Sequence, residues 1–152
     1  MTEIERMLDQ LQRAFEGPAW HGPSIREVLA PVDAAIAMRR SLAHVHTIWE
    51  IVEHVAAWEA IARRRLEGEI VTATPAMDWP PVAGGSEAAW QDTLQRLHAG
   101  HDRLRATVAA FPEPKLDAMR PDGETTWYAL IHGIIQHDLY HAGQIAILAK
   151  TP

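Results

Sequence analysis

Two histidines one helical turn apart, His137 and His141 in the segment HDLYHAGQI, have the spacing best suited to chemistry in this chain. Spacing i, i+4 places both imidazoles on the same face of an α-helix, close enough to bind one ion. That face is otherwise apolar, so burying two imidazoles without partners would cost on the order of a few kcal/mol. A bound metal would offset this cost. The alternative is a pair of core histidines that are satisfied by hydrogen bonds. The apolar residues on this face are Leu130, Ile134, Ile145 and Leu148.

The third candidate ligand is His54, which shares a helix face with Ile51, Trp58 and Ile61. With a rise of about 1.5 Å per residue, His54 lies about two turns after the start of its helix, and His141 about two turns before the end of its own. These depths coincide in an antiparallel pair. We therefore expect the three histidines to hold one metal and to leave a position open for water or substrate. Neutral imidazoles suit Zn, Ni, Cu or Fe better than Ca or Mg.

Four other residues are candidates for supporting roles. Glu50 lies one turn before His54 and could orient a ligand or act as a general base, although a capping bond to its own helix also explains it. Gln144 could reach a metal-bound water or form an interhelical hydrogen bond. Trp20 and His21, in the segment WHGPS, are candidates for the substrate side of the site, or for a packed loop.

Four long amphipathic helices must position these residues. Capping residues and apolar periodicity predict them over 2–16, 47–68, 86–111 and 125–149, with shorter helices over 24–31 and 33–38. Residues 68–85 are rich in Pro, Gly and Thr and predict a long crossover, although 70–74 could pair locally as a strand. The prediction is an all-α four-helix bundle. Its second and third helices run parallel and its fourth is antiparallel to both, with Thr125 as the cap of the fourth.

Composition limits the classes of protein and partner. The length of 152 residues predicts a single domain over residues 1–152. The absence of cysteine excludes disulfides, thiolate metal sites and cysteine nucleophiles. A net charge of −6 argues against a nucleic-acid partner. The charged, amphipathic N-terminus and the lack of a long apolar run predict a cytoplasmic protein with no membrane partner.

The segments IWEIVEHVAAWE and GIIQHDLYHAGQIAIL resemble the DinB-like superfamily, also called YfiT-like metal-dependent hydrolases. The combination of an inward histidine on the second long helix with HxxxH followed by AGQI carries the resemblance, which covers nearly the whole chain. It implies an up-down-down-up bundle, a Ni or Zn site on His54, His137 and His141, and a homodimer.

The activity that this resemblance implies is less uniform than the fold. Some members are metal-dependent S-transferases that use low-molecular-weight thiols, and a related group isomerises maleylpyruvate. The expectation is a metal-dependent hydrolase or thiol transferase that acts on a small molecule, with a thiol as a possible cofactor. The alternative is a non-catalytic metal-binding module used in a stress response or in dimerisation.

Overall fold

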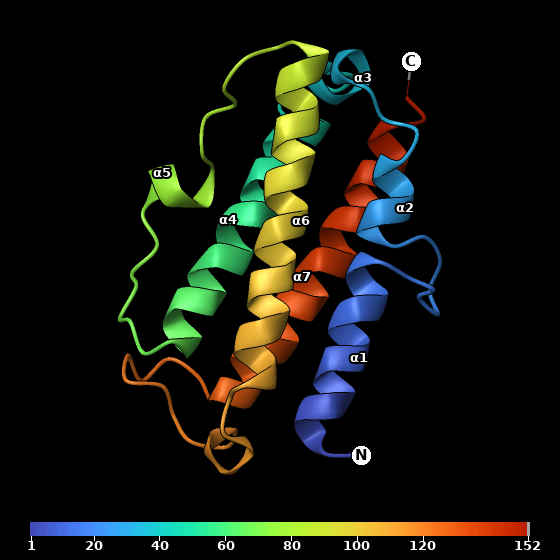
Figure 1. The fold of residues 1–152 in the computed structure, drawn as a ribbon. Helices are drawn as coiled ribbons and strands as arrows, with labels where there is room; N and C mark the ends of the chain where they lie inside the picture. The colour runs from blue at the N-terminus through green and yellow to red at the C-terminus, as the bar shows by residue number, and fades with distance from the viewer. Residues whose placement is uncertain (152) are drawn as a thin grey trace.

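The computed structural model of the protein describes residues 1–151. Within these residues all regular secondary structure is helical, with loops in between (Figure 1). The prediction of an all-α fold is thus confirmed. The four long helices are α1 (Glu3–Phe15), α4 (Ile48–Leu66), α6 (Glu87–Ala109) and α7 (Trp127–Leu148). Four short elements lie between them: α2 (Ile25–Leu29), α3 (Ala34–Met38), α5 (Pro75–Asp78) and the 3₁₀ turn η1 (Glu113–Lys115). Residues 70–74, where local strand pairing was an option, are not part of a strand.

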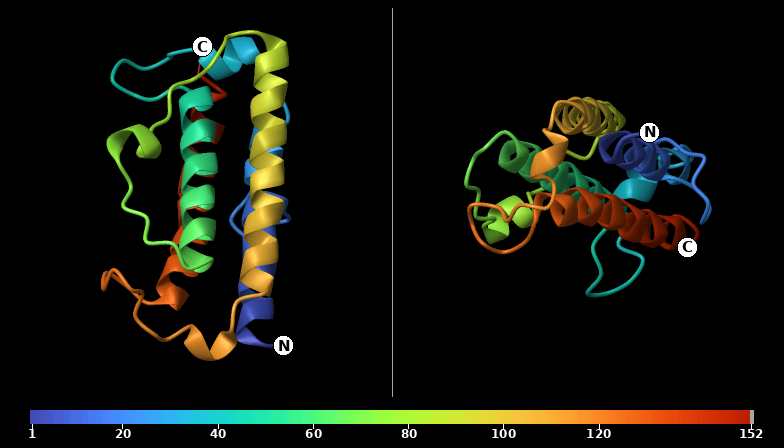
Figure 2. Two further views of the ribbon diagram at one scale, coloured as in Figure 1. Left: turned by 60° about the vertical axis from the view of Figure 1, so that its left-hand side comes forward. Right: turned by 90° about the horizontal axis from the view of Figure 1, so that it is seen from below.

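The long helices pack against one another along most of their lengths. Helix α4 contacts both α6 and α7, and α1 contacts the same two helices. Figure 2 shows α4 and α6 running in one direction, while α1 and α7 run in the other. Because α4 and α7 are antiparallel neighbours, residues near the start of α4 come level with residues near the end of α7. Among the described residues, no helix is long and apolar enough to cross a bilayer.

Side-chain caps define where the long helices begin. Capping boxes open α1 at Thr2 and α4 at Thr47, and each such cap stabilises its helix by about 0.5–2 kcal/mol. Helix α7 begins one residue later than predicted. Its cap is Thr126, whose hydroxyl accepts from the amide of Ala129. The carbonyl of Thr125 instead accepts from the amide of Arg120, which holds Thr125 in the preceding turn.

The crossover between α4 and α6 is not entirely irregular, because it contains the one-turn helix α5. Thr74 caps this helix and Pro75 occupies its first turn, where a missing amide hydrogen costs little. Trp58 of α4 donates its indole N–H to Asp78 Oδ1 at 2.7 Å, which ties α5 to α4. Helix α5 therefore lies against α4, on the side away from α6 in Figure 1.

The apolar core falls into two parts. The first surrounds Trp49 and Trp90 near α2 and α3, and the second surrounds Met7, Leu104 and Ile131 near the start of α1. Polar side chains lie between these two parts on three of the long helices, and they are the most buried titratable groups of the protein. They are Glu59, His101 and Asp138, each with no exposed surface.

Candidate metal centre

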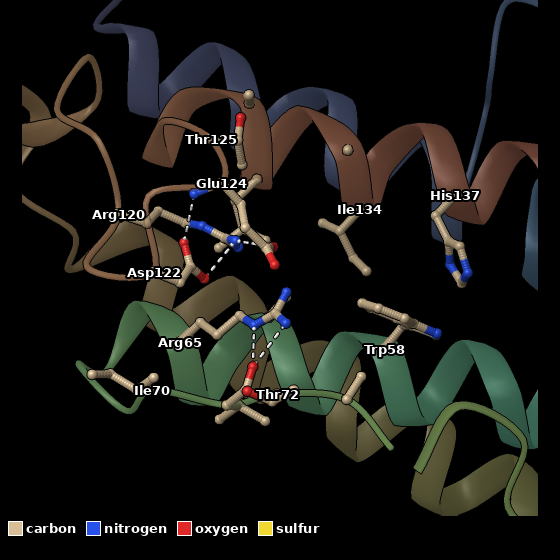
Figure 3. Close-up of a pocket in the computed structure, with 16 residues that line it drawn as sticks. Trp58, Arg65, Ile70, Thr72, Arg120, Asp122, Glu124, Thr125, Ile134 and His137 are labelled. Carbon is tan, nitrogen blue, oxygen red and sulfur yellow. Dashed lines mark hydrogen bonds and ion pairs between the residues drawn. The ribbon is translucent and has the colours of Figure 1, made fainter. Parts of the chain in front are cut away.

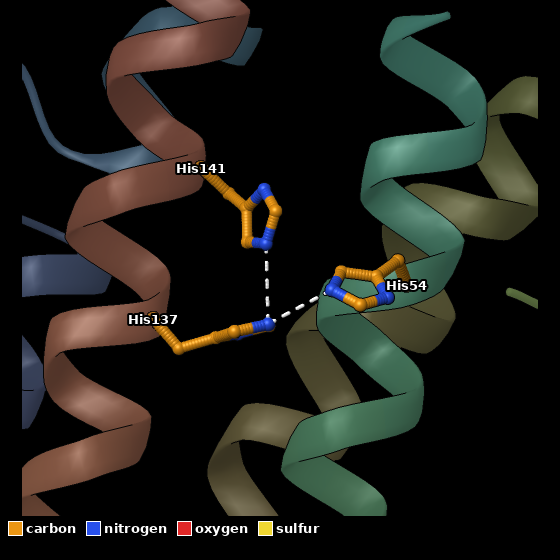
Figure 4. Close-up of side chains that lie close together, drawn as sticks. All are labelled: His54, His137 and His141. Atoms are coloured by element: carbon orange, nitrogen blue, oxygen red, sulfur yellow. Dashed lines mark hydrogen bonds between the residues drawn. The ribbon is translucent and has the colours of Figure 1, made fainter. Parts of the chain in front are cut away.

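Three imidazoles meet between α4 and α7 (Figure 4), and we call them the triad: His54, His137 and His141. His137 Nε2 lies 2.9 Å from His54 Nε2 and 3.1 Å from His141 Nε2. Ligand nitrogens that bind a metal at 2.0–2.1 Å are themselves separated by about 2.9–3.4 Å. The structure therefore brings together the three histidines that the sequence selected, at separations suited to a single ion.

The outer nitrogen of His54 is held by the crossover. Its Nδ1 donates to the carbonyl oxygen of Asp78 at 2.6 Å, and Oδ1 of the same residue lies 3.3 Å away. A carbonyl can only accept, so Nδ1 carries the proton and Nε2 presents a lone pair to the triad. Helix α5, which sequence analysis missed, thus sets the tautomer of one ligand.

The outer nitrogen of His141 is held from within α7. Gln144, three residues later, accepts from Nδ1 of His141 at 2.7 Å. This contact again leaves Nε2 unprotonated in the neutral ring. Gln144, predicted near the site, is therefore a positioning residue for His141. The third ring differs, because His137 Nδ1 is buried without a hydrogen-bond partner.

An aromatic stack covers the triad from the crossover side. Trp79 lies parallel to His54 with ring centroids 3.9 Å apart, and His46 lies on the other face of Trp79 at 3.5 Å. These rings exclude water from one side of His54. His46 lies just before α4, in the segment that leads into this helix.

Burial keeps the triad neutral. Desolvation lowers the pKa of His54 and His141 below the usual value, and it lowers the pKa of His137 to about 3, with further lowering from the two neighbouring imidazoles. At neutral pH all three rings are therefore uncharged, with one nitrogen protonated and the other free to bind, which is the form that binds a transition metal.

Two cavities adjoin the triad. One of about 520 Å³ begins beside His137 and Trp58 and ends among Arg65, Arg120 and Glu124 (Figure 3). Ala62, Leu130 and Ile134 line its middle. The other, of about 370 Å³, is bordered by His46, Trp79, His141 and Gln144. His44 and Tyr140 also line it, and its remaining walls are apolar, with Leu42, Ile51 and Ile147 among them. A small molecule therefore has space beside the triad on both its His137 and its His141 side.

The other predicted residues lie elsewhere. Glu50 bonds to the amide of Thr47 at 2.7 Å and to Arg40 at 2.7 Å, so its carboxylate serves the cap and an ion pair. Trp20 is fully exposed, and with His21 it borders a different cavity, which shares no residue with the triad. The structure does not bring these three side chains to the histidines.

Sequence analysis missed a second group of titratable residues, which we call the buried cluster: Glu59, His101 and Asp138. Desolvation raises the pKa of Glu59 to about 8 and raises that of Asp138 well above the usual value, and it lowers the pKa of His101 to about 4. The sequence does contain a signal that could have revealed these buried polar residues. Each residue occupies a position in an apolar helical stripe, such as Val55, Glu59 and Ala62 on α4.

Comparison with known proteins identifies a family but no individual relative. No curated protein and no solved structure matches the chain. A model of the DinB superfamily matches residues 19–145, a segment that includes the triad, the crossover and most of α7. The chain therefore belongs to the DinB superfamily.

Proposed function

We propose that the protein is a metal-dependent enzyme in which His54, His137 and His141 hold a divalent transition metal, with Ni or Zn as the best candidates. The reaction is the attack of water or a low-molecular-weight thiol on a small electrophile. One observation carries the proposal. The Nε2 atoms of His54 and His141 both lie within 3.1 Å of His137 Nε2, and acceptors at Nδ1 leave both of them unprotonated.

Without a cation this convergence is unfavourable. The lone pairs of His54 and His141 both point at His137 Nε2, and a single proton there could form a good hydrogen bond with only one of them. Nitrogen donors alone suit a transition metal, and three protein ligands are typical of catalytic sites. When bound, a divalent metal would supply Lewis acidity and lower the pKa of a ligated water or thiol.

The residues of the chain supply orientation and exclusion of water. Asp78 and Gln144 hold the outer nitrogens of His54 and His141, as second-sphere groups do in metal sites. Trp79 and His46 cover one side of the triad. The cavity beside His137 would take a small substrate with an apolar body, because apolar side chains line its middle.

A four-helix bundle of up-down-down-up topology is the architecture that we infer for this site. The directions of the long helices and the crossover between α4 and α6 support it. This arrangement explains how two helices far apart in sequence present ligands at one depth, in the way that bundles build metal sites from facing helices.

The proposal is tested by metal analysis and by assays on one set of proteins. Wild type and His54→Ala are loaded with Ni²⁺ or Zn²⁺ and are then assayed for ester hydrolysis and for conjugation of a thiol to an electrophile. We expect one of the two activities in wild type and a loss of at least about 100-fold in the variant, because a ligand is removed.

His132→Ala is the matched control, because His132 lies on α7 but outside the triad. It should keep both metal and activity. Metal bound through the triad without either activity would favour the non-catalytic binding module instead. Wild type that takes up no metal through the triad would overturn both alternatives.

A further inference from the structure

The buried cluster draws on three helices and is closed by a fourth. Glu59 comes from α4, His101 from α6 and Asp138 from α7, and each offers a ligand atom within 4.8 Å of the other two. Phe15 of α1 stacks on the His101 ring at a centroid distance of 3.8 Å and an interplanar angle of 9°. The three side chains have essentially no contact with solvent, since none exceeds 1% exposure.

Hydrogen bonding leaves most of the cluster unsatisfied. His101 Nδ1 lies 2.8 Å from Glu59 Oε1. The remaining nitrogen of His101, the other oxygen of Glu59 and both oxygens of Asp138 are buried without a partner. Two ionised carboxylates can only accept, so either a shared proton or a cation must lie between Glu59 and Asp138. The remaining buried atoms without a partner would each cost about 1–3 kcal/mol, and a cation would satisfy several of them at once, whereas a proton shared by the two carboxyl groups would not.

The cluster forms a polar layer through the middle of the core. On each helix the polar residue lies between an apolar residue of one core part and one of the other: Val55 and Ala62 flank Glu59, Leu97 and Leu104 flank His101, and Ile135 and Ala142 flank Asp138. Apolar side chains at these positions would join the two parts into one continuous core. Replacing buried ionic groups by apolar residues is often neutral or stabilising, so such a layer is poorly explained by stability alone.

We propose that Glu59, His101 and Asp138 form a second, solvent-excluded metal site, distinct from the triad. Two carboxylates and one neutral imidazole balance the charge of a divalent cation. This mixed oxygen and nitrogen donor set suits Mn²⁺, Fe²⁺ or Zn²⁺. Helix bundles build such sites from inward side chains on facing helices. The complete burial means that the ion must be acquired during folding.

The two sites occupy different faces of the same helices. Asp138 follows His137 directly, so their side chains leave α7 about 100° apart, and Glu59 follows His54 by five residues on α4. The triad faces the crossover, whereas the buried cluster faces α6 and α1. Loss of one site therefore need not remove the other, which makes the two separable by experiment.

The decisive protein is the double variant His54→Ala/His137→Ala, in which the buried cluster is unchanged. Both this variant and wild type are unfolded in denaturant that contains a chelator. They are then refolded with Zn²⁺ or Mn²⁺, desalted and analysed for bound metal. We expect one ion per chain in the double variant and one more in wild type. A metal-free double variant that has refolded would overturn the proposal and would leave the function of the triad unaffected.

Glu59→Gln in the double-variant background assigns the ion to the cluster, because it removes a ligand charge but keeps the shape. The remaining metal should be lost. The control is Glu53→Gln, another buried acid on α4, which binds Arg96 at 2.8 Å instead. It should keep the ion. Metal retained after Glu59→Gln would contradict the assignment. The same change made in wild type and treated with metal provides a second check. A gain in Tm there would also contradict the assignment, because it would mean that the cluster holds protons and not an ion.

Discussion

The triad and the buried cluster are adjacent on α7 but differ in access and in hydrogen bonding. The triad borders two cavities, and acceptors outside it hold two of its three rings. The buried cluster borders no solvent, and its outer atoms have no partners. A site that exchanges substrate needs an open path and ligands that are already oriented, and the triad has both. A closed site such as the buried cluster could hold an ion but could not exchange a substrate. Two groups of titratable side chains within a few ångströms of helix rise thus differ in whether a small molecule could reach them.

The largest effect that this comparison predicts is the loss of the triad metal in His137→Ala. His137 Nε2 lies within 3.1 Å of both other nitrogens, so removing it leaves only two of the three ligands. We expect metal affinity at the triad to fall by at least about 100-fold. The fall is measured by competition with a chelator of known affinity. A change of less than tenfold would mean that another residue completes the site.

Phe15→Ala should affect the buried cluster and spare the triad. The Phe15 ring is buried against His101, and removing a buried aromatic side chain costs about 3–5 kcal/mol of unfolding free energy. Denaturant unfolding measures this loss. Chelator competition at the triad should give an unchanged affinity. If triad affinity falls in parallel with stability, the two regions are coupled and the comparison fails.

The proximity of the three triad histidines could be predicted, because it follows from helix geometry and from the antiparallel packing of two helices. Spacing i, i+4 brought His137 and His141 together, and matching depth on antiparallel helices added His54. Helix α5 escaped prediction because four residues provide no periodicity and are held by tertiary contacts such as that between Trp58 and Asp78. With α5 absent, the residue that orients His54 could not be identified.

The buried cluster was missed for a different reason. Glu59 and Asp138 stand in apolar stripes, but an acidic residue on a long helix is usually solvated, and the local pattern does not reveal which neighbours bury it. Trp20 was a candidate for the substrate side of the site or for a packed loop, because the loop after α1 was expected at the same end of the bundle as the start of α4. The structure instead leaves its ring exposed, next to a turn that pairs Ala19 with Gly22.

Gln144→Ala tests whether the hydrogen bonds that orient the triad rings, which the buried cluster lacks, contribute to metal affinity. Loss of the acceptor frees the Nδ1 proton of His141, so the ring can rotate or change tautomer. Changes to such supporting groups cost about 10–100-fold in metal affinity, and we expect that range at the triad. The control is Gln136→Ala, because Gln136 is exposed on the same helix. Equal affinities in the two variants would remove the positioning role of Gln144.

The pH dependence of stability should report the buried cluster in metal-free protein. Burial lowers the pKa of His101 to about 4 from 6.5, so the unfolded chain takes up a proton first as pH falls. The stability that neutral His101 contributes is complete above pH 6.5 and is lost as pH falls towards 4. One pKa unit corresponds to 1.36 kcal/mol, so we expect His101 to contribute a loss of about 2 kcal/mol between pH 7 and pH 5, while the raised pKa values of Glu59 and Asp138 act in the opposite direction.

His101→Gln isolates this contribution, because the triad histidines have lowered pKa values and act in the same direction. Urea unfolding of both proteins at several pH values gives the difference. The variant should show the shallower decline between pH 7 and pH 5. Parallel curves would mean that His101 is not neutral and desolvated as the structure places it.

The smallest predicted effect concerns Glu50 and defines the limit of the triad. Its carboxylate accepts from the amide of Thr47, pairs with Arg40 and lies 3.4 Å from His46 Nδ1, but it does not touch the triad itself. Glu50→Gln should therefore cost about 1 kcal/mol through the cap and the weakened ion pair. Metal affinity and any measured turnover should stay within about twofold, because the triad is untouched.

A general base would behave differently, since its removal lowers turnover by about 100-fold or more while stability is little changed. Turnover and unfolding free energy measured on the same variant thus decide whether the reactive region ends at the triad or extends to the start of α4.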